Sequence, residues 1–156
     1  MKDRIKNMSD IARTRMMLVI AVTVMFVIVY WGYIFGGRYL LFKDAGMDTI
    51  CQFYPMYIHV IDSIKEGTLS LWNFEWGLGC DTLTRQEWIM DPCAWVIIGT
   101  GVVFGVETVK NMLLVMQFVK IMACALICFE FLKYYGASVR ARFIASCLFA
   151  FNGWIM

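Results

Sequence analysis

Apolar residues in this chain form long uninterrupted runs separated by polar segments. Residues 16–35 contain no charge, residues 112–132 form a second run that carries Lys120 and Glu130, and a third run starts at residue 143 and continues to residue 156. A helix needs about 20 apolar residues to cross roughly 30 Å of hydrocarbon at about 1.5 Å per residue. The pattern predicts an all-α polytopic membrane protein, with the third helix truncated, so we expect the sequence to be an N-terminal fragment.

The composition supports this class, because 61% of the residues are hydrophobic and only two are prolines. The first run is longer than the roughly 7 to 15 apolar residues of a secretory signal, and no small-residue cleavage site follows it. We therefore expect residues 16–35 to be a retained transmembrane helix rather than a signal peptide.

Charged residues predict the orientation of these helices. Residues 1–15 carry five basic and two acidic side chains, residues 36–107 carry four basic and nine acidic ones, and residues 133–142 carry three basic and no acidic ones. Lysine and arginine accumulate in the cytoplasmic flanks of membrane helices. The N-terminus and the 133–142 loop should therefore be cytoplasmic. The acidic loop should be extracytoplasmic, and residues 112–132 should return the chain to the cytoplasm.

One apolar segment of the acidic loop, residues 93–106, leaves an alternative open. Its 14 residues are few for a membrane span, and segments of about 10 to 14 are more typical of interfacial, re-entrant or protein-packed helices. We predict an interfacial helix at about 92–106. If the segment crossed instead, the chain would have four spans and the basic 133–142 loop would lie outside.

A second helix is predicted in the loop at about 53–66, where apolar residues stand at positions 53, 54, 57, 58, 61 and 64. This is the spacing of one helical face. Pro55 suits the first turn and Gly67 suits the position after the last turn. We expect this helix to lie on the membrane surface. The indole rings that prefer the headgroup level belong to Trp72, Trp76, Trp88 and Trp95.

Candidate chemistry begins directly after the first span, where Asp44, Asp48 and Gln52 are spaced four apart. In a helix the three side chains would share one face. A carboxylate beside the bilayer loses hydration, which suits it to accept a proton. The alternative is a solvated acidic edge that only terminates the span.

Three further residues are candidate substrate contacts. Asp91 precedes Pro92, which is a strong helix-start signal, so a capping role competes with a second acid. Lys120 interrupts an apolar run, where a charge normally faces a cavity or a partner. Arg85 could hold a phosphate, although such residues are more often solvated.

Other classes of site find little support. His59 has no neighbouring ligand, and the six cysteines lack the paired spacings of a zinc site. No phosphate-binding glycine loop, nucleophile elbow or basic aromatic patch is present, so nucleic acid is not an expected partner.

The order of short motifs resembles the YfhO-like family of bacterial membrane proteins. The motifs run from Asp48 through Gln52, Phe53 and Tyr54, Glu66-Gly67, Leu71-Trp72-Asn73, Gly77 and Gly79, and Asp91-Pro92 to Asn152-Gly153. The resemblance covers most of the chain from Phe35 onward.

This resemblance implies a C-type membrane glycosyltransferase fold: a helical bundle with a large first extracytoplasmic loop that carries surface helices. Such enzymes transfer a sugar from a polyprenyl phosphate donor to a cell-envelope glycopolymer or a lipid-linked acceptor at the outer face of the bacterial cytoplasmic membrane. Asp48 matches the expected general base and Asp44 is a secondary candidate. Gln52 and Asp91 would line the site. Arg85, Lys120 or a divalent metal would face the phosphate.

A non-enzymatic alternative predicts the same topology. In it the chain belongs to a transporter or to an assembly subunit of envelope polysaccharide synthesis, and Lys120 contacts the substrate or pairs two helices.

Overall fold

The computed structural model describes residues 2–42, 46–68, 72–74, 78–81 and 91–152. These residues form helices and one short antiparallel ladder, in which β1 (Trp72–Asn73) pairs with β2 (Cys80–Asp81). The chain divides into two compact units, Met1–Arg38 with Gln117–Met156, and Tyr39–Met116. The predicted all-α class is confirmed.

Six α-helices and three shorter helical turns follow one another along the described chain. They are α1 (Lys2–Val29), α2 (Trp31–Ile34), a 3₁₀ turn (Leu40–Phe42), a π-helical turn (Thr49–Phe53), α3 (Tyr54–Glu66), α4 (Pro92–Phe104), a second 3₁₀ turn (Val106–Thr108), α5 (Val109–Tyr134) and α6 (Val139–Ala150). Two stretches, Ile11–Val29 and Val106–Tyr134, are long and apolar enough to cross a membrane.

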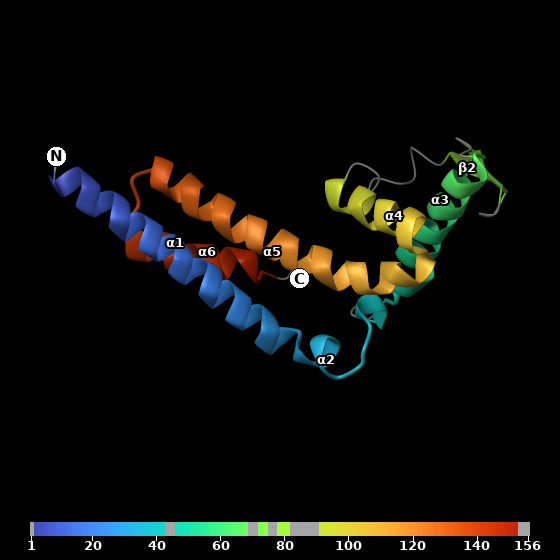
Figure 1. Ribbon diagram of the computed structural model, residues 1–156, viewed down its shortest axis with the longest axis horizontal. Coiled ribbons are helices and arrows are strands. Elements are labelled where there is room, and N and C mark those ends of the chain that lie inside the picture. Colours follow the sequence, from blue (N-terminus) through green and yellow to red (C-terminus); the bar gives the residue numbers. More distant parts are fainter. Residues whose placement is uncertain (1, 43–45, 69–71, 75–77, 82–90, 153–156) are drawn as a thin grey trace. The chain divides into compact units, whose positions relative to one another are not determined.

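The first unit packs α1 and α6 together with the part of α5 that follows Met116 (Figure 1). Buried residues recur every four positions on each helix, because residues four apart lie on one helical face. These rows are Leu18, Val22 and Phe26 on α1, continued by Tyr30 in the turn that follows it, Gln117, Ile121, Ala125 and Phe129 on α5, and Arg142, Ser146 and Ala150 on α6. The Phe26 and Phe118 rings meet edge to face, 4.9 Å apart. The core of this unit is therefore a single seam between three helices.

Ion pairs link α1 to α5 in this unit. Arg15 on α1 forms an ion pair with Glu130 on α5, and Lys133 lies 3.6 Å from the same carboxylate. The Arg142 side chain is buried, with its guanidinium 5.1 Å from the centre of the Phe129 ring. Its Nε and Nη1 atoms have no hydrogen-bond partner among the described residues.

The outer faces of the two long apolar helices are exposed. Only 17% of the most apolar window of the first stretch and 22% of that of the second are buried. Ile28 and Ile127, for example, are 67% and 68% exposed. A helix of a soluble core would bury most of such a surface, and continuous exposed apolar surface indicates contact with lipid or protein.

Two helix boundaries differ from those predicted. The first helix begins at Lys2 rather than near residue 16, because the basic N-terminal segment contains no helix breaker, and it ends at Val29 before the turn at Tyr30. The last helix begins at Val139 rather than residue 143, because Ser138 caps it by accepting a hydrogen bond from the Ala141 amide. Arg142 therefore belongs to a helix and not to the loop.

The second unit is built on the packing of α3 against α4. Its core contains Tyr57, Val60 and Ile61 from α3, Ala94, Ile97 and Ile98 from α4, and Val109. A Cβ atom at Gly101 would overlap the Ile61 side chain and lie 3.3 Å from Val109. Glycine at this position therefore lets the two helices approach closely. The helix predicted at about 92–106 is present as α4, and one of its faces is packed on protein; its place at the membrane interface stays a prediction.

Helix α3 has nearly the predicted bounds, and its buried residues coincide only in part, at Tyr57 and Ile61, with the predicted apolar face. Pro55 stands in its first turn, and Gly67, with φ of 69°, ends it in the left-handed conformation. The buried positions include Met56 and Val60, which were not expected, whereas Phe53 is exposed. Packing on α4 selects this face, and the sequence spacing did not contain that information.

Candidate functional site

Asp48 follows a backbone conformation that non-glycine residues rarely adopt. Met47 has a positive φ of 56°, and its carbonyl accepts a hydrogen bond of 2.8 Å from the Cys51 amide. Such strain persists where the surrounding structure holds it, and it is concentrated at functional sites. The Met47 turn therefore sets the position from which the Asp48 side chain extends.

A π-helical turn, Thr49–Phe53, separates Asp48 from α3. The Tyr54 amide donates to the Thr49 carbonyl, five residues earlier. Pro55 explains this winding, because its ring would clash with the carbonyl four residues before it in a regular α-helix, and it has no amide hydrogen. Single π-turns of this kind are frequent at functional sites.

The Asp48 carboxylate is held by Gln52. The Gln52 Nε2 atom donates a hydrogen bond of 2.8 Å to Asp48 Oδ1, so the expected common face is confirmed for this pair. Both side chains are exposed, and a carboxylate with one oxygen engaged can still accept a proton at the other. The protein does not supply the desolvation expected at Asp48. Asp44, the secondary candidate, lies outside the described residues.

Asp91 caps α4. Its Oδ1 atom accepts a hydrogen bond of 2.9 Å from the Cys93 amide, in the geometry of a helix N-cap. Burial raises the pKa of the nearby Tyr57 hydroxyl to about 12, and the charges of Asp91 and Cys93 add to this rise. The capping role is thus confirmed, and the role of Asp91 as a substrate contact stays a prediction.

The described structure does not test whether the expected phosphate contacts surround Asp48. Lys120 is half-buried on α5, in the first unit, whereas Asp48 belongs to the second. Arg85 lies outside the described residues. Within the described part of the chain, no group of three or more histidine, cysteine or acidic side chains could hold a metal ion.

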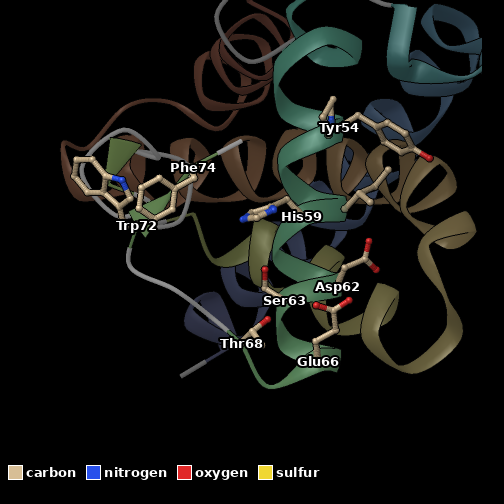
Figure 2. A pocket seen from close by; sticks show the side chains of 10 residues that line it. Tyr54, His59, Asp62, Ser63, Glu66, Thr68, Trp72 and Phe74 are labelled. Carbon is tan, nitrogen blue, oxygen red and sulfur yellow. The ribbon is translucent and has the colours of Figure 1, made fainter. Parts of the chain in front are cut away.

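A cavity of about 700 Å³ runs along the outer side of α3 and is called here the α3 groove (Figure 2). Trp72 and Phe74 lie on one side of the helix, His59 points toward them, and the carboxylates of Asp62 and Glu66 lie next to each other further along. Its full lining is Tyr54, Pro55, Ile58, His59, Asp62, Ser63, Glu66, Thr68, Trp72 and Phe74.

No family model, curated protein or solved structure matches this chain. The resemblance to the YfhO-like family therefore stays a prediction.

The sequence contained part of the signal for the groove. Asp62 and Glu66 are spaced four apart and so share a helical face, but the same spacing is typical of the polar side of any surface helix. For Trp72 the sequence predicts a membrane anchor. Its place beside α3 depends on the pairing of β1 with β2, in which Trp72 lies opposite Asp81. No local pattern in the sequence specifies that pairing.

Proposed function

We propose that this chain is part of a membrane glycosyltransferase that uses a polyprenyl phosphate sugar as donor at the outer face of a bacterial cytoplasmic membrane. The observation that carries the proposal is the arrangement at Asp48. Its carboxylate is accessible, is oriented by Gln52, and stands between a left-handed turn and a π-turn. A side chain that only terminated a span would not require this local strain.

In the proposed reaction, Asp48 removes the proton from an acceptor hydroxyl as that oxygen attacks the anomeric carbon of the donor. A new carbon–oxygen bond forms to the sugar while the bond from that carbon to the phosphate oxygen breaks. The bonding electrons leave with the lipid phosphate, and the anomeric configuration inverts. The charge that develops on the phosphate needs a cation, and Arg85, Lys120 or a divalent metal are the candidates.

The membrane arrangement supports this chemistry. Two helices are long and apolar enough to span, and their outer faces are exposed. In the proposed topology the N-terminus is cytoplasmic and Asp48 is extracytoplasmic, in line with the distribution of basic residues.

Cysteine labelling tests this topology. The native cysteines are replaced, and single cysteines are then introduced at Ala137 or restored at Cys51, whose side chain is exposed. A membrane-impermeant maleimide added outside whole cells should label Cys51 and should not label Ala137→Cys. External labelling of Ala137→Cys would contradict the topology and favour four spans.

The enzyme class is tested with the complete protein in lipid nanodiscs. Mannosyl, glucosyl, galactosyl and N-acetylglucosaminyl polyprenyl phosphates are supplied with a cell-envelope glycan extract as acceptor. We expect transfer from one donor, with an inverted anomeric configuration in the product by NMR. Retention of configuration would contradict the single-base mechanism, and no transfer from any donor would contradict the proposed function.

A transporter is the second candidate, because Lys120 places a charge within the second long apolar helix. In that case sugar-lipid or polysaccharide flux, measured in proteoliposomes, would fall in Lys120→Met while no new glycosidic bond forms.

A further inference from the structure

The α3 groove combines two surfaces of different chemistry, one aromatic and one rich in oxygen atoms. It is separate from Asp48, which does not line it. A volume of about 700 Å³ lies within the usual range for small-molecule sites, roughly 300 to 1,000 Å³. The groove is therefore large enough for a ligand of its own.

The aromatic wall is formed by Trp72 and Phe74. Their ring centres are 6.3 Å apart with planes at 62°, and the side chains are 47% and 78% exposed. Gly79, with φ of 98°, lies against the Trp72 indole so closely that a Cβ atom there would overlap the ring nitrogen. The Trp72 ring is thus in close contact with Gly79, and about half of the side chain remains exposed.

The polar side of the groove offers hydrogen-bonding groups along α3. Asp62 and Glu66 present exposed carboxylates, which are strong acceptors. Ser63 is 9% exposed and lines the groove, where its hydroxyl can donate a hydrogen bond to a ligand or accept one from it.

This combination favours a sugar. A pyranose ring has a flat carbon–hydrogen face that can lie on an indole, and hydroxyl groups around its edge that donate to carboxylates. Aromatic side chains provide a large apolar surface in such sites, and a few polar groups fix the orientation of the ligand.

The negative charge of the groove favours the acceptor of the proposed transferase over its phosphate-bearing donor. Asp62 and Glu66 would repel the phosphate of the lipid donor. A neutral sugar or an amino sugar, whose ammonium group would pair with the carboxylates, meets no such repulsion. Helix α3 has 13 residues and is therefore roughly 20 Å long, which suits more than one sugar unit.

We propose that the α3 groove binds the acceptor glycan, a neutral or amino-sugar oligosaccharide, and holds it on the same helical segment that begins at Asp48. The inference rests on the proposed function, since only a transferase needs an acceptor site distinct from its donor site. It names the chemical class of that acceptor and excludes anionic groups at this position.

Binding is measured by fluorine NMR on the complete protein labelled with 5-fluorotryptophan, in nanodiscs. The Trp72 resonance is assigned with Trp72→Phe, and the probes are cellotetraose, the glucosamine tetramer, glucose 1-phosphate and spermine. We expect a saturable shift of the Trp72 resonance with a tetrasaccharide at concentrations on the order of 1 to 10 mM. Glucose 1-phosphate should cause none.

Two conservative variants identify the polar contacts. Asp62→Asn and Glu66→Gln should each weaken binding of the glucosamine tetramer about tenfold, as expected for loss of a charged hydrogen bond. Trp95→Phe changes an exposed indole on α4 outside the groove and should leave affinity unchanged. Unchanged resonances of the other tryptophans confirm that the variants fold.

The proposal is overturned if neither tetrasaccharide shifts Trp72, if glucose 1-phosphate shifts it equally, or if spermine alone does so. These outcomes are independent of catalysis. Asp48→Asn should abolish transfer and preserve tetrasaccharide binding. Binding without transfer in the wild-type protein would contradict the proposed function alone, and transfer without binding would contradict the groove assignment alone.

Discussion

Gln52 donates a hydrogen bond of 2.8 Å to the carboxylate of Asp48 from one helical turn away. This hydrogen bond holds the Oδ1 atom of Asp48 and thereby sets the orientation of its second oxygen, Oδ2. The Gln52 side chain can do this without touching a substrate. Gln52 is therefore best described as a positioning residue for the proposed base.

Replacing Gln52 should affect turnover rather than binding. Gln52→Leu removes the donor, and we expect kcat to fall about tenfold with KM little changed, because misplacement of a base by a fraction of an ångström costs rate. Gln52→Glu keeps the shape but sets two carboxylates against each other and should lower kcat further. A change confined to KM would contradict the positioning role.

Two glycines of α4 should respond in opposite directions to the same substitution. Nothing lies near a Cβ atom at Gly99, so Gly99→Ala should stabilise the fold by up to about 1 kcal/mol through helix propensity. The added methyl group of Gly101→Ala would overlap the buried Ile61 side chain. This substitution should lower the free energy of unfolding by about 1 to 2 kcal/mol net. Thermal unfolding of both variants in one detergent measures this, and equal shifts would contradict the α3–α4 packing.

Burial of Tyr57 should make the stability of the second unit sensitive to alkali. Its pKa is raised to about 12, so the folded state favours the neutral phenol. That contribution is fully present below the ordinary tyrosine pKa of about 10 and is lost as the pH rises through about 12.

The measurement compares the melting temperature of the wild-type protein with that of Tyr57→Phe across this range. The wild-type protein should lose stability relative to the variant only above about pH 10. Tyr134→Phe, at an 85% exposed position, should follow the wild-type curve. A pH-independent difference between the wild-type protein and Tyr57→Phe would contradict the burial of Tyr57.

The buried guanidinium of Arg142 gives a prediction for the first unit. Two of its nitrogen atoms lack partners among the described residues, so Arg142→Met, which keeps the length and removes the charge, should change stability by less than about 1 kcal/mol or raise it. Arg140→Met, at an exposed position, is the control. A loss of about 3 to 5 kcal/mol in Arg142→Met would show that the charge is paired.

Features with a local cause could be predicted from the sequence. Asp91 before Pro92 and Gly67 after Glu66 mark helix ends through their own backbone chemistry, and the structure confirms both. The Asp48–Gln52 contact follows from spacing alone.

Features that depend on distant contacts could not be predicted. The buried face of α3 is selected by α4, and Val60 is buried for that reason rather than for its place in the predicted apolar spacing. The Trp72 indole reaches α3 through strand pairing and the close approach of Gly79. The start of α1 at Lys2 was also not predictable from the charged residues. Charged side chains indicate where a membrane span ends, but a helix can continue through them into water.

The most direct test of the proposed mechanism is the single-turnover rate of sugar transfer in Asp48→Asn. The substitution keeps the size of the side chain and removes the base. Glu107→Gln is the matched control, because it removes a carboxylate that is 80% exposed and that pairs with Lys110 rather than with Gln52. We predict that Asp48→Asn lowers the rate by at least about a hundredfold, while Glu107→Gln keeps the wild-type rate. Undiminished transfer in Asp48→Asn would contradict the assignment of Asp48 as the general base.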